Sequence, residues 1–482
     1  MLKWFQIFVV LIAFPLCCSA TNHMVIHVKD YGVGDQNSGI DNYRILKQCH
    51  QDALKYDAEV IYDELSIINI EIPVDARPIP LSSRTNFSNV CINVLNKQKD
   101  IFLFERVGKT ESINVSIGNL ALGCKIGNFY GIGAVIVKDD NKWIENRKGY
   151  SYGFSRKDVL LSKNGRILND PIQTYCTNSS KPECVYCHFN PGKKFLRNLF
   201  FCRNVESTYK TFLVRIEYEY NVDLSGIRVN TPQSSLTGDQ LITIYNCAYI
   251  FLNDIRITGT YSHSDKFGYG LNINNVYKFN VKRLYARAEW GVFGTNNINN
   301  AILEDCDINR FDIHCYGRDV KSINCRYSDL YNQFSSIYGS VSFYKCSFEN
   351  FVPLLMEPSF NAYTPFEVSF KACTFNLSAR KNYILTLSGL EETHNSRPEL
   401  ARKALPNIKI KNCTINLADD VKEWYIVNTG KVSYKESLDY ISKIEVNRLK
   451  INGNVDYKLF STKLETTNPL KVVRKRVKLN KK

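Results

Sequence analysis

The chain lacks two features that would place it in familiar functional classes. Beyond its first 20 residues, no apolar run approaches the ~18 residues that a membrane-spanning helix requires. No nucleic-acid-binding module motif is present either, although the formal net charge is +15. Methionine is scarce, at 3 residues, whereas cysteine is abundant, at 16. The sequence therefore predicts no transmembrane segment and no nucleic-acid partner.

The first 20 residues are typical of a secretory signal peptide. Lys3 precedes an apolar run at 7–16, and small residues follow it. A lipoprotein anchor at Cys17 or Cys18 is the alternative, which the lack of small residues just before Cys17 disfavours. The leader predicts a secreted, periplasmic or cell-surface protein in an oxidising compartment.

A phrase of alternating apolar and polar residues recurs in the second half of the chain. Each copy has two short period-2 stretches around a central cysteine or aliphatic anchor. The anchors are Ile227, Ile255, Leu284, Cys306, Cys325, Cys346, Cys373, Cys413 and Leu449. Their spacing is too irregular for a helical array and suits β-coils with loops of variable length. Because one coil cannot bury its own inward face, the coils must stack, with the cysteines as an internal ladder.

These repeats resemble the right-handed parallel β-helix of the pectate-lyase-like superfamily, over about residues 212–452. A second similarity lies near the N-terminus, where Asp30-Tyr31-Gly32 precedes a helical stretch that begins at Asp41. In that family such a helix caps the open end of the coils. The chain departs from the pattern at Gln36, where the family has glycine. The resemblance implies an all-β, right-handed parallel β-helix (solenoid) with an N-terminal capping helix, but no particular activity.

We expect five segments along the chain. They are a signal peptide at 1–20, a strand and capping helix at 21–60, a β-rich region with a cysteine cluster at 61–209, β-helix coils at 210–455, and a C-terminal cap with a basic tail at 456–482. In the third segment the alternation of apolar and polar residues is irregular. The segment therefore holds either early coils with long insertions or a small β-rich subdomain packed against the helix.

The candidate catalytic residues come from the strands between the anchors. In β-helix enzymes the active site follows the exposed face of one stacked strand, where outward side chains lie about 4.8 Å apart. Period 2 places Asp312, His314 and Tyr316 outward on one strand, with Glu289 one coil earlier. In a lyase, His314 or Tyr316 would move the proton. In a hydrolase, Glu289 and Asp312 would be the paired carboxyls.

Neighbouring residues complete a candidate substrate-binding surface. Guanidinium groups would neutralise a uronate carboxylate, and amides and aromatic rings would contact sugars. The candidates are Arg310, Arg318, Asn272, Asn274, Trp290 and Tyr338. Exposed polar residues on a β-helix are also commonly plain ladder residues paired with their neighbours. The catalytic motifs of polygalacturonases and calcium-dependent pectate lyases are absent, so no catalytic residue is transferred from those families.

The densest cysteine cluster consists of Cys176, Cys184, Cys187 and Cys202. Secretion favours a loop held by two disulfides among them, and free thiols are the other non-metal interpretation. The C-x-x-C-H pattern at 184–188 leaves a zinc site or a c-type haem as alternatives, although only two methionines besides Met1 could serve as a sixth haem ligand. We expect no cofactor, since calcium and zinc have no further support.

The last 12 residues, 471–482, carry seven positive charges and no negative charge. Such a tail is typically a solvated segment. The alternative is electrostatic adhesion to anionic glycan, lipid headgroups or nucleic acid, of which the signal peptide disfavours an intracellular nucleic acid.

These features predict a secreted carbohydrate-active β-helix protein. Its partner would be a neutral or acidic polysaccharide, which it cleaves as a lyase or glycoside hydrolase in a groove along the stacked strands. The alternative is a non-catalytic glycan-binding protein of the cell-envelope or adhesin type. A phage-type tailspike depolymerase is disfavoured by the signal peptide and by the lack of an evident trimerisation segment, and the oligomeric state stays open.

Overall fold

A computed structural model gives the structure of most of the chain. The described residues are 24–63, 65–95, 100–104, 110–144, 154–172, 182–202, 212–230, 240–258, 270–286, 293–313, 316–328, 333–334, 337–349, 354–356, 367–387, 404–405, 407–428, 440–441, 443–461 and 471–480. Within them, α1 (Gly39–Tyr56) is the one α-helix, preceded by a 3-10 turn, η1 (Val28–Tyr31). The predicted leader at 1–20 lies outside the described residues.

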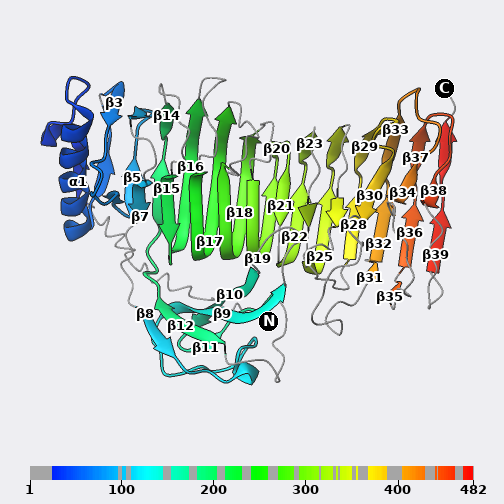
Figure 1. Ribbon diagram of the computed structural model, residues 1–482, viewed down its shortest axis with the longest axis horizontal. Coiled ribbons are helices and arrows are strands. Elements are labelled where there is room, and N and C mark those ends of the chain that lie inside the picture. The colour runs from blue at the N-terminus through cyan, green and yellow to red at the C-terminus, as the bar shows by residue number, and fades with distance from the viewer. Residues whose placement is uncertain are drawn as a thin grey trace, which may run out of the picture.

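The strands form a right-handed parallel β-helix in which each coil contributes to three sheet faces (Figure 1). Face 1 contains β1 (Val25–His27), β2 (Glu59–Ile61), β5 (Arg84–Asn86), β13 (Lys194–Arg197), β16 (Tyr220–Asn230), β17 (Gln240–Thr258), β18 (Leu271–Ala286), β19 (Phe293–Glu304), β22 (Gly317–Ile323), β25 (Ile337–Tyr344), β28 (Glu367–Lys371), β32 (Asn407–Lys411), β36 (Lys443–Asn447) and β39 (Lys471–Lys475).

The chain passes from face 1 to face 2 and then to face 3 in every coil. Face 2 contains β3 (Ile67–Ile70), β6 (Cys91–Val94), β14 (Phe200–Cys202), the last parts of β16, β17 and β18, β20 (Asp307–Ile308), β23 (Arg326–Ser328), β26 (Ser347–Glu349), β29 (Thr374–Leu377), β33 (Thr414–Leu417), β37 (Lys450–Asn452) and β40 (Lys478–Asn480). Face 3 contains β4 (Ile79–Leu81), β7 (Asp100–Phe104), β15 (Phe212–Glu217), the first parts of β17, β18 and β19, β21 (Phe311–Ile313), β24 (Gln333–Phe334), β27 (Leu354–Met356), β30 (Tyr383–Leu387), β34 (Tyr425–Asn428) and β38 (Lys458–Phe460). A short parallel pair, β31 (Ala404–Leu405) and β35 (Tyr440–Ile441), lies outside these faces.

The nine predicted anchors stack inside the coils at the turn between faces 1 and 2. All are at most 2% exposed. Each follows a residue with positive φ, such as Asp305 (φ 54°) before Cys306 and Arg448 (φ 56°) before Leu449. Aspartate and asparagine adopt this left-handed conformation readily, whereas arginine adopts it at a steric cost that the stacked coils impose.

The anchor cysteines also make hydrogen bonds to the coil before them. The thiol of Cys346 lies 3.6 Å from the carbonyl oxygen of Ser322, and that of Cys413 lies 3.5 Å from the carbonyl oxygen of Phe370. Thiols are weak donors that suit a tightly packed interior. The predicted cysteine ladder is therefore apolar in its packing and also hydrogen-bonded.

The helix α1 caps the N-terminal end of the coils and packs against β3 and β4 (Figure 1). Ser38 begins it, because its side-chain oxygen accepts a hydrogen bond from the amide of Asp41 at 3.1 Å. Leu46, Cys49 and Ala53 are fully buried on the face that meets the coils. The predicted capping helix is confirmed.

A small antiparallel sheet is inserted between β7 and β13. Its strands are β8 (Thr110–Ile113), β9 (Ile132–Ile144), β10 (Phe154–Lys163), β11 (Arg166–Ile167) and β12 (Glu183–His188), in the order β11-β10-β9-β12-β8, with a 3-10 turn, η2 (Ile117–Asn119). Residues 61–209 thus contain both early coils and a subdomain. Figure 1 shows this insert beside the middle coils, and its contacts are with β17, β18 and β19 rather than with α1.

The insert packs on the corner between faces 3 and 1. Val159 and Leu161 of the insert join a hydrophobic cluster with Ala248 and Tyr277 of the coils. Polar contacts flank this cluster: the amide of Lys157 donates to the side-chain oxygen of Asn297 at 3.1 Å, and the side chain of Asn299 donates to the carbonyl oxygen of Asp170 at 2.8 Å. Packing and hydrogen bonds therefore place the insert against the coils.

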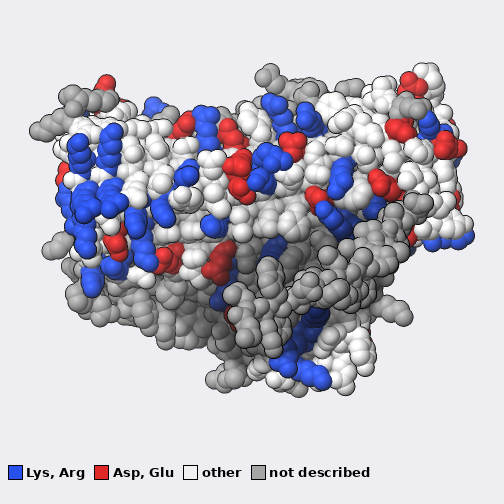
Figure 2. Space-filling view, turned by 180° about the vertical axis from the view of Figure 1, so that it is seen from behind, with Lys and Arg blue, Asp and Glu red and all other residues white. Residues whose placement is uncertain are grey.

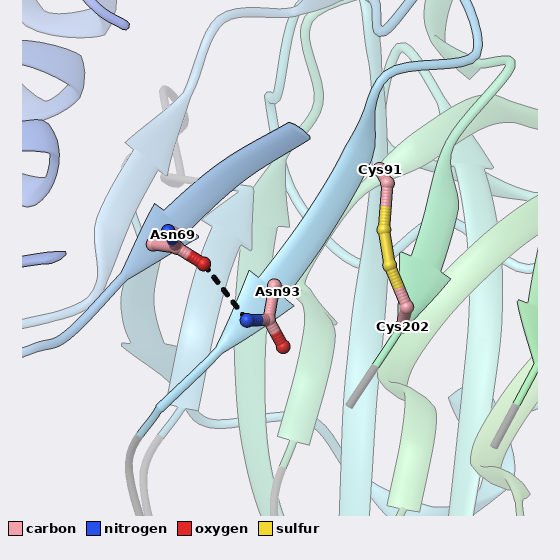
Figure 3. The surroundings of a disulfide bond; sticks show 4 residues. All are labelled: Asn69, Cys91, Asn93 and Cys202. Carbon is pink, nitrogen blue, oxygen red and sulfur yellow. Dashed lines mark hydrogen bonds between the residues drawn. A yellow bond between two sulfur atoms is a disulfide. The ribbon is translucent and has the colours of Figure 1, made fainter. Parts of the chain in front are cut away.

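The prediction of two disulfides within the cysteine cluster is wrong for Cys202, whereas Cys184 and Cys187 are free thiols, as the alternative interpretation had it. Cys202 of β14 bonds to Cys91 of β6, one coil earlier on face 2 (Figure 3). Cys184 and Cys187 lie on opposite faces of β12, in separate hydrophobic clusters, so they cannot bond to each other or share one metal or haem site. Cys176 lies outside the described residues. Cys91 is the partner of Cys202 because stacking of the coils makes residues far apart in sequence neighbours in space.

The basic C-terminal segment is part of the solenoid. β39 and β40 pair in register with β36 and β37 and form a final coil. Asn480 extends a stack of amides, since its side chain donates to Asn452 at 2.9 Å and Asn452 donates to Asn416 at 2.7 Å. The expectation of a solvated tail is therefore wrong for residues 471–480.

Candidate functional site

The predicted site residues that are described lie mostly on the outer side of face 3. Here the parallel register aligns Arg215, Asn272 and Asp312 in one outward column, with Thr243 and Gly294 between them. A second column, two residues further along each strand, aligns Glu217, Tyr245, Asn274 and Asn296. In this register Asn272 lies two coils before Asp312 in the same column, and Asn274 lies in the second column.

Amide side chains connect the two columns. Asn296 donates to the side-chain oxygen of Asn274 at 2.7 Å, and Asn274 donates to that of Asn272 at 2.7 Å. Asn272 in turn donates to the hydroxyl of Tyr245 at 3.2 Å. All three asparagines are half-buried. This amide ladder presents fixed donors and acceptors along three coils.

Asp312 and Arg310 form a buried ion pair. The Nε atom of Arg310 lies 2.5 Å from a carboxylate oxygen of Asp312, and their side chains are 1% and 0% exposed. The expectation that both face solvent is therefore wrong, although Asp312 does point out of face 3. Burying an unpaired charge is unfavourable. The guanidinium group of Arg310 supplies the compensating charge for the carboxylate of Asp312, and the residues around the pair exclude solvent from it.

The remaining predicted residues do not join Asp312. Tyr316 is 1% exposed rather than outward, because its positive φ (61°) places it at the corner between faces 3 and 1. The guanidinium of Arg318 donates to the carbonyl oxygen of Pro171 at 2.9 Å and so holds the insert. Tyr338 is its half-buried neighbour on β25. The predicted Glu289, Trp290 and His314 lie outside the described residues.

An open groove of about 730 Å³ crosses the outer side of face 1. Its apolar floor has Phe251 of β17 and Ile302 of β19, both half-buried. Because an outward position normally carries a polar side chain, these two residues form an apolar patch that water does not favour. The groove spans four coils, or about 14 Å at the usual strand spacing.

Charged pairs flank the groove at each end. Lys193 lies 3.3 Å from the carboxylate of Asp223 on β16, and Lys282 of β18 lies 2.9 Å from that of Glu304 on β19. Asn280 lies beside Phe251 in the register. An apolar floor with a few polar groups at its rim is the common form of a small-molecule or oligomer site.

The two carboxylates of this groove lie on strands that are far apart along the solenoid. Asp223 and Glu304 belong to strands three coils apart, or about 14 Å at the usual spacing. Paired catalytic carboxyls lie about 5 to 9.5 Å apart. Among the described residues, no group of three or more histidine, cysteine, aspartate or glutamate side chains could hold a metal ion.

The sequence pattern used above did not predict this groove. Its signal is a break of period 2: Phe251 stands between Ile250 and Leu252, and Ile302 stands between Ala301 and Leu303. In each triplet the outer residues point inward and the middle residue points outward. Three consecutive apolar residues in a solenoid strand thus mark an apolar patch on the surface.

Comparison with solved structures finds the same fold in several proteins. The tailspike protein gp49 from Pseudomonas phage LKA1 is similar with a TM-score of 0.62 and 11% identity, over 93% of this chain and 79% of that one. The tailspike gp61 of Pseudomonas phage phi297 has a TM-score of 0.48 and 12% identity, over 95% and 81%. The gp54 tailspike of Acinetobacter baumannii bacteriophage AP22, solved in complex with A. baumannii capsular saccharide, has a TM-score of 0.46 and 12% identity, over 89% and 76%.

The likeness to the gp49 tailspike confirms the parallel β-helix fold that the sequence predicted. No family model matches the sequence, and no curated protein matches it. Within the described segments, no helix combines the length and the apolar character that crossing a bilayer demands.

Proposed function

We propose that the protein is a secreted carbohydrate-binding β-helix protein that holds a glycan in the groove of face 1. The observation that carries this proposal is the exposed apolar floor formed by Phe251 and Ile302. The faces of sugar rings are apolar while their rims are polar, and an aromatic ring flanked by donors and acceptors matches both. The signal peptide predicted from the sequence supports a location outside the cell.

The charges of the groove favour a neutral or weakly charged glycan. Lys193, Lys282 and Arg283 contribute three positive charges, and Asp223 and Glu304 contribute two negative charges. Four of these five groups take part in ion pairs with each other. A nearly balanced lining gives little long-range attraction to a polyanion.

Binding to a panel of neutral and acidic polysaccharides tests this proposal. Phe251→Ala removes most of the apolar floor, and we expect at least a tenfold weaker affinity for the bound polysaccharide, equivalent to about 1.4 kcal/mol. Tyr285→Ala is the matched control: it removes an aromatic side chain that is 39% exposed on the face 2 part of β18, outside the groove. Equal losses in both variants, or no binding to any polysaccharide, would contradict the proposal.

Cleavage of the bound polysaccharide, as a lyase or a glycoside hydrolase, is the second candidate. The buried pair of Arg310 and Asp312 beside the amide ladder favours it, because active sites commonly hold such desolvated charges. Substrate would reach Asp312 only after the covering residues move. This candidate uses a site on face 3 that is distinct from the groove.

Absorbance of unsaturated uronate ends and release of reducing ends separate the two candidates. New ends with absorbance indicate a lyase, and new ends alone indicate a hydrolase. Asp312→Asn should abolish either signal while leaving binding unchanged, and Asp223→Asn in the groove should leave turnover per bound substrate unchanged. Because Asp312→Asn leaves Arg310 without its partner, its folding is checked by circular dichroism. Binding without product would reject the enzymatic candidate.

A further inference from the structure

The last coils carry a basic surface that the groove does not use. Figure 2 shows Lys and Arg side chains gathered at the C-terminal end, on the left, whereas both signs of charge mix over the middle coils. Seven exposed side chains of faces 1 and 2 and of the turns between them make up this surface, which we call the basic face. They are Lys371, Lys411, Arg448, Lys450, Lys475, Arg476 and Lys478.

The parallel register stacks these cations in columns. On face 1, Lys371 aligns with Lys411. Asn447 follows in the next coil of the same column, and Lys475 follows in the coil after that. On face 2, Lys450 aligns with Lys478. Neighbouring coils lie about 4.8 Å apart, so like charges repel one another within each column. Such an arrangement is unfavourable unless an anion lies across it.

The carboxylate of Glu445 on face 1 attracts Lys475 electrostatically, but no member of the basic face forms an ion pair with a described residue. Other cations of these coils form ion pairs, as Lys409 does with Glu367 at 2.5 Å and Lys443 does with Glu445 at 2.8 Å. Of the acidic residues in the last coils, Glu445 lies on face 1 and pairs with Lys443, whereas Asp456 lies in the connection from face 2 to face 3 and pairs with Arg474.

We propose that the basic face binds an acidic polysaccharide, whose carboxylate or sulfate groups lie across the last coils. A polymer with regularly repeated anions matches columns of cations that repeat with every coil. Arginine adds bidentate recognition of carboxylates at the turns, through Arg448 and Arg476. This site is separate from the groove of face 1, and the proposal does not depend on the function proposed for that groove.

Two other anionic partners fit the surface less well. Adsorption to a lipid bilayer usually adds apolar side chains that enter the membrane, and here the large apolar side chain exposed in the last described coil is Val472 alone. Single-stranded nucleic acid is bound on aromatic platforms, but Tyr344 beside the basic face is covered by Lys345 and Lys371, at 5.3 and 5.4 Å from its ring centre.

The test compares two triple variants of the full mature chain in binding to polygalacturonate. The face variant carries Lys411→Ser, Lys450→Ser and Lys478→Ser. The control variant loses the same charge elsewhere, through Lys55→Ser, Lys163→Ser and Lys321→Ser. We expect the face variant to bind at least tenfold more weakly at low salt and with a smaller salt dependence, and the control to stay within about threefold of the parent.

Three outcomes would overturn the proposal. Equal losses in the two variants would show that net charge alone drives binding. A loss of binding to phosphatidylserine vesicles or to DNA that exceeds the loss for polygalacturonate would assign the face to those partners. Phe251→Ala separates the two sites: it should leave polygalacturonate binding at the basic face unchanged, whereas the face variant should leave binding in the groove unchanged.

Discussion

The two ends of the solenoid are finished in opposite ways. At the N-terminal end, α1 covers β3 and β4 with fully buried side chains such as Leu46 and Ala53. At the C-terminal end, β39 and β40 are the last strands of their faces among the described residues, and exposed lysines and arginines line them. An edge strand is protected from pairing with another chain either by a cover or by charge. This protein uses both solutions.

The difference is visible within one column of inward residues. Ile408 and Ile444 of face 1 are 1% and 2% exposed, and Val472, which continues their column, is 41% exposed. A coil buries its inward side chains only when another element covers them. The cap should therefore contribute to stability, whereas the charged end should act mainly on solubility and binding.

Truncation of one apolar side chain at each end should separate these roles. Leu46→Ala in α1 leaves a cavity under a fully buried side chain, and we expect it to lower the free energy of unfolding by about 2 to 5 kcal/mol. Leu479→Ala is the counterpart in the last coil, where the side chain is half-buried, and we expect less than about 1 kcal/mol. Urea denaturation measures both, and equal losses would show that the ends contribute alike.

Acid should weaken the N-terminal cap through His50. This side chain is fully buried, and burial lowers its pKa from 6.5 to about 3. The amide of Ser82 donates to Nδ1 at 3.1 Å, so Nε2 carries the proton and donates to the hydroxyl of Tyr62 at 2.7 Å. The folded state thus holds the neutral ring while the unfolded chain takes up a proton below about pH 6.5.

The stability that this neutral ring contributes is complete above about pH 6.5 and falls as the pH decreases toward about 3. Between about pH 6.5 and 4.5 the expected loss is on the order of 3 kcal/mol. Urea denaturation at these two pH values measures it, with His50→Gln as a variant that should remove this part of the pH dependence. An unchanged dependence in His50→Gln would exclude His50 as its source.

Replacing charged residues of the last strands with neutral ones should change self-association more than it changes the free energy of unfolding. We expect Lys471→Ser, Lys475→Ser and Lys478→Ser together to alter the free energy of unfolding by less than about 1 kcal/mol, since all three side chains are exposed. The uncovered strands should then pair between molecules, and light scattering should detect larger species. The control triple variant at Lys55, Lys163 and Lys321 should not associate. If neither variant associates, charge is not what protects this end.

At the candidate site, the sequence pattern indicates which side of a strand a residue faces but not whether that residue is buried. Asn272, Asn274 and Asp312 lie on the outer side of face 3, and period 2 bears on this placement because alternation along a strand is local. This pattern could not show that Asp312 is covered, since burial depends on segments that return from elsewhere in the chain. The groove around Phe251 was missed for a related reason: an apolar residue pointing outward looks, in sequence, like a residue of the core.

Local periodicity predicts stacked coils with a capped N-terminus, because the anchors from Ile227 to Leu449 and the amphipathic helix repeat at short range along the chain. Which residues from distant coils meet depends on how the coils stack in the folded protein. The tertiary structure paired Cys202 with Cys91, placed the insert over the corner at Asn297, and turned the basic C-terminus into a coil. Stacking places coils next to one another regardless of the length of the loops between them, and a local pattern carries no information about those partners.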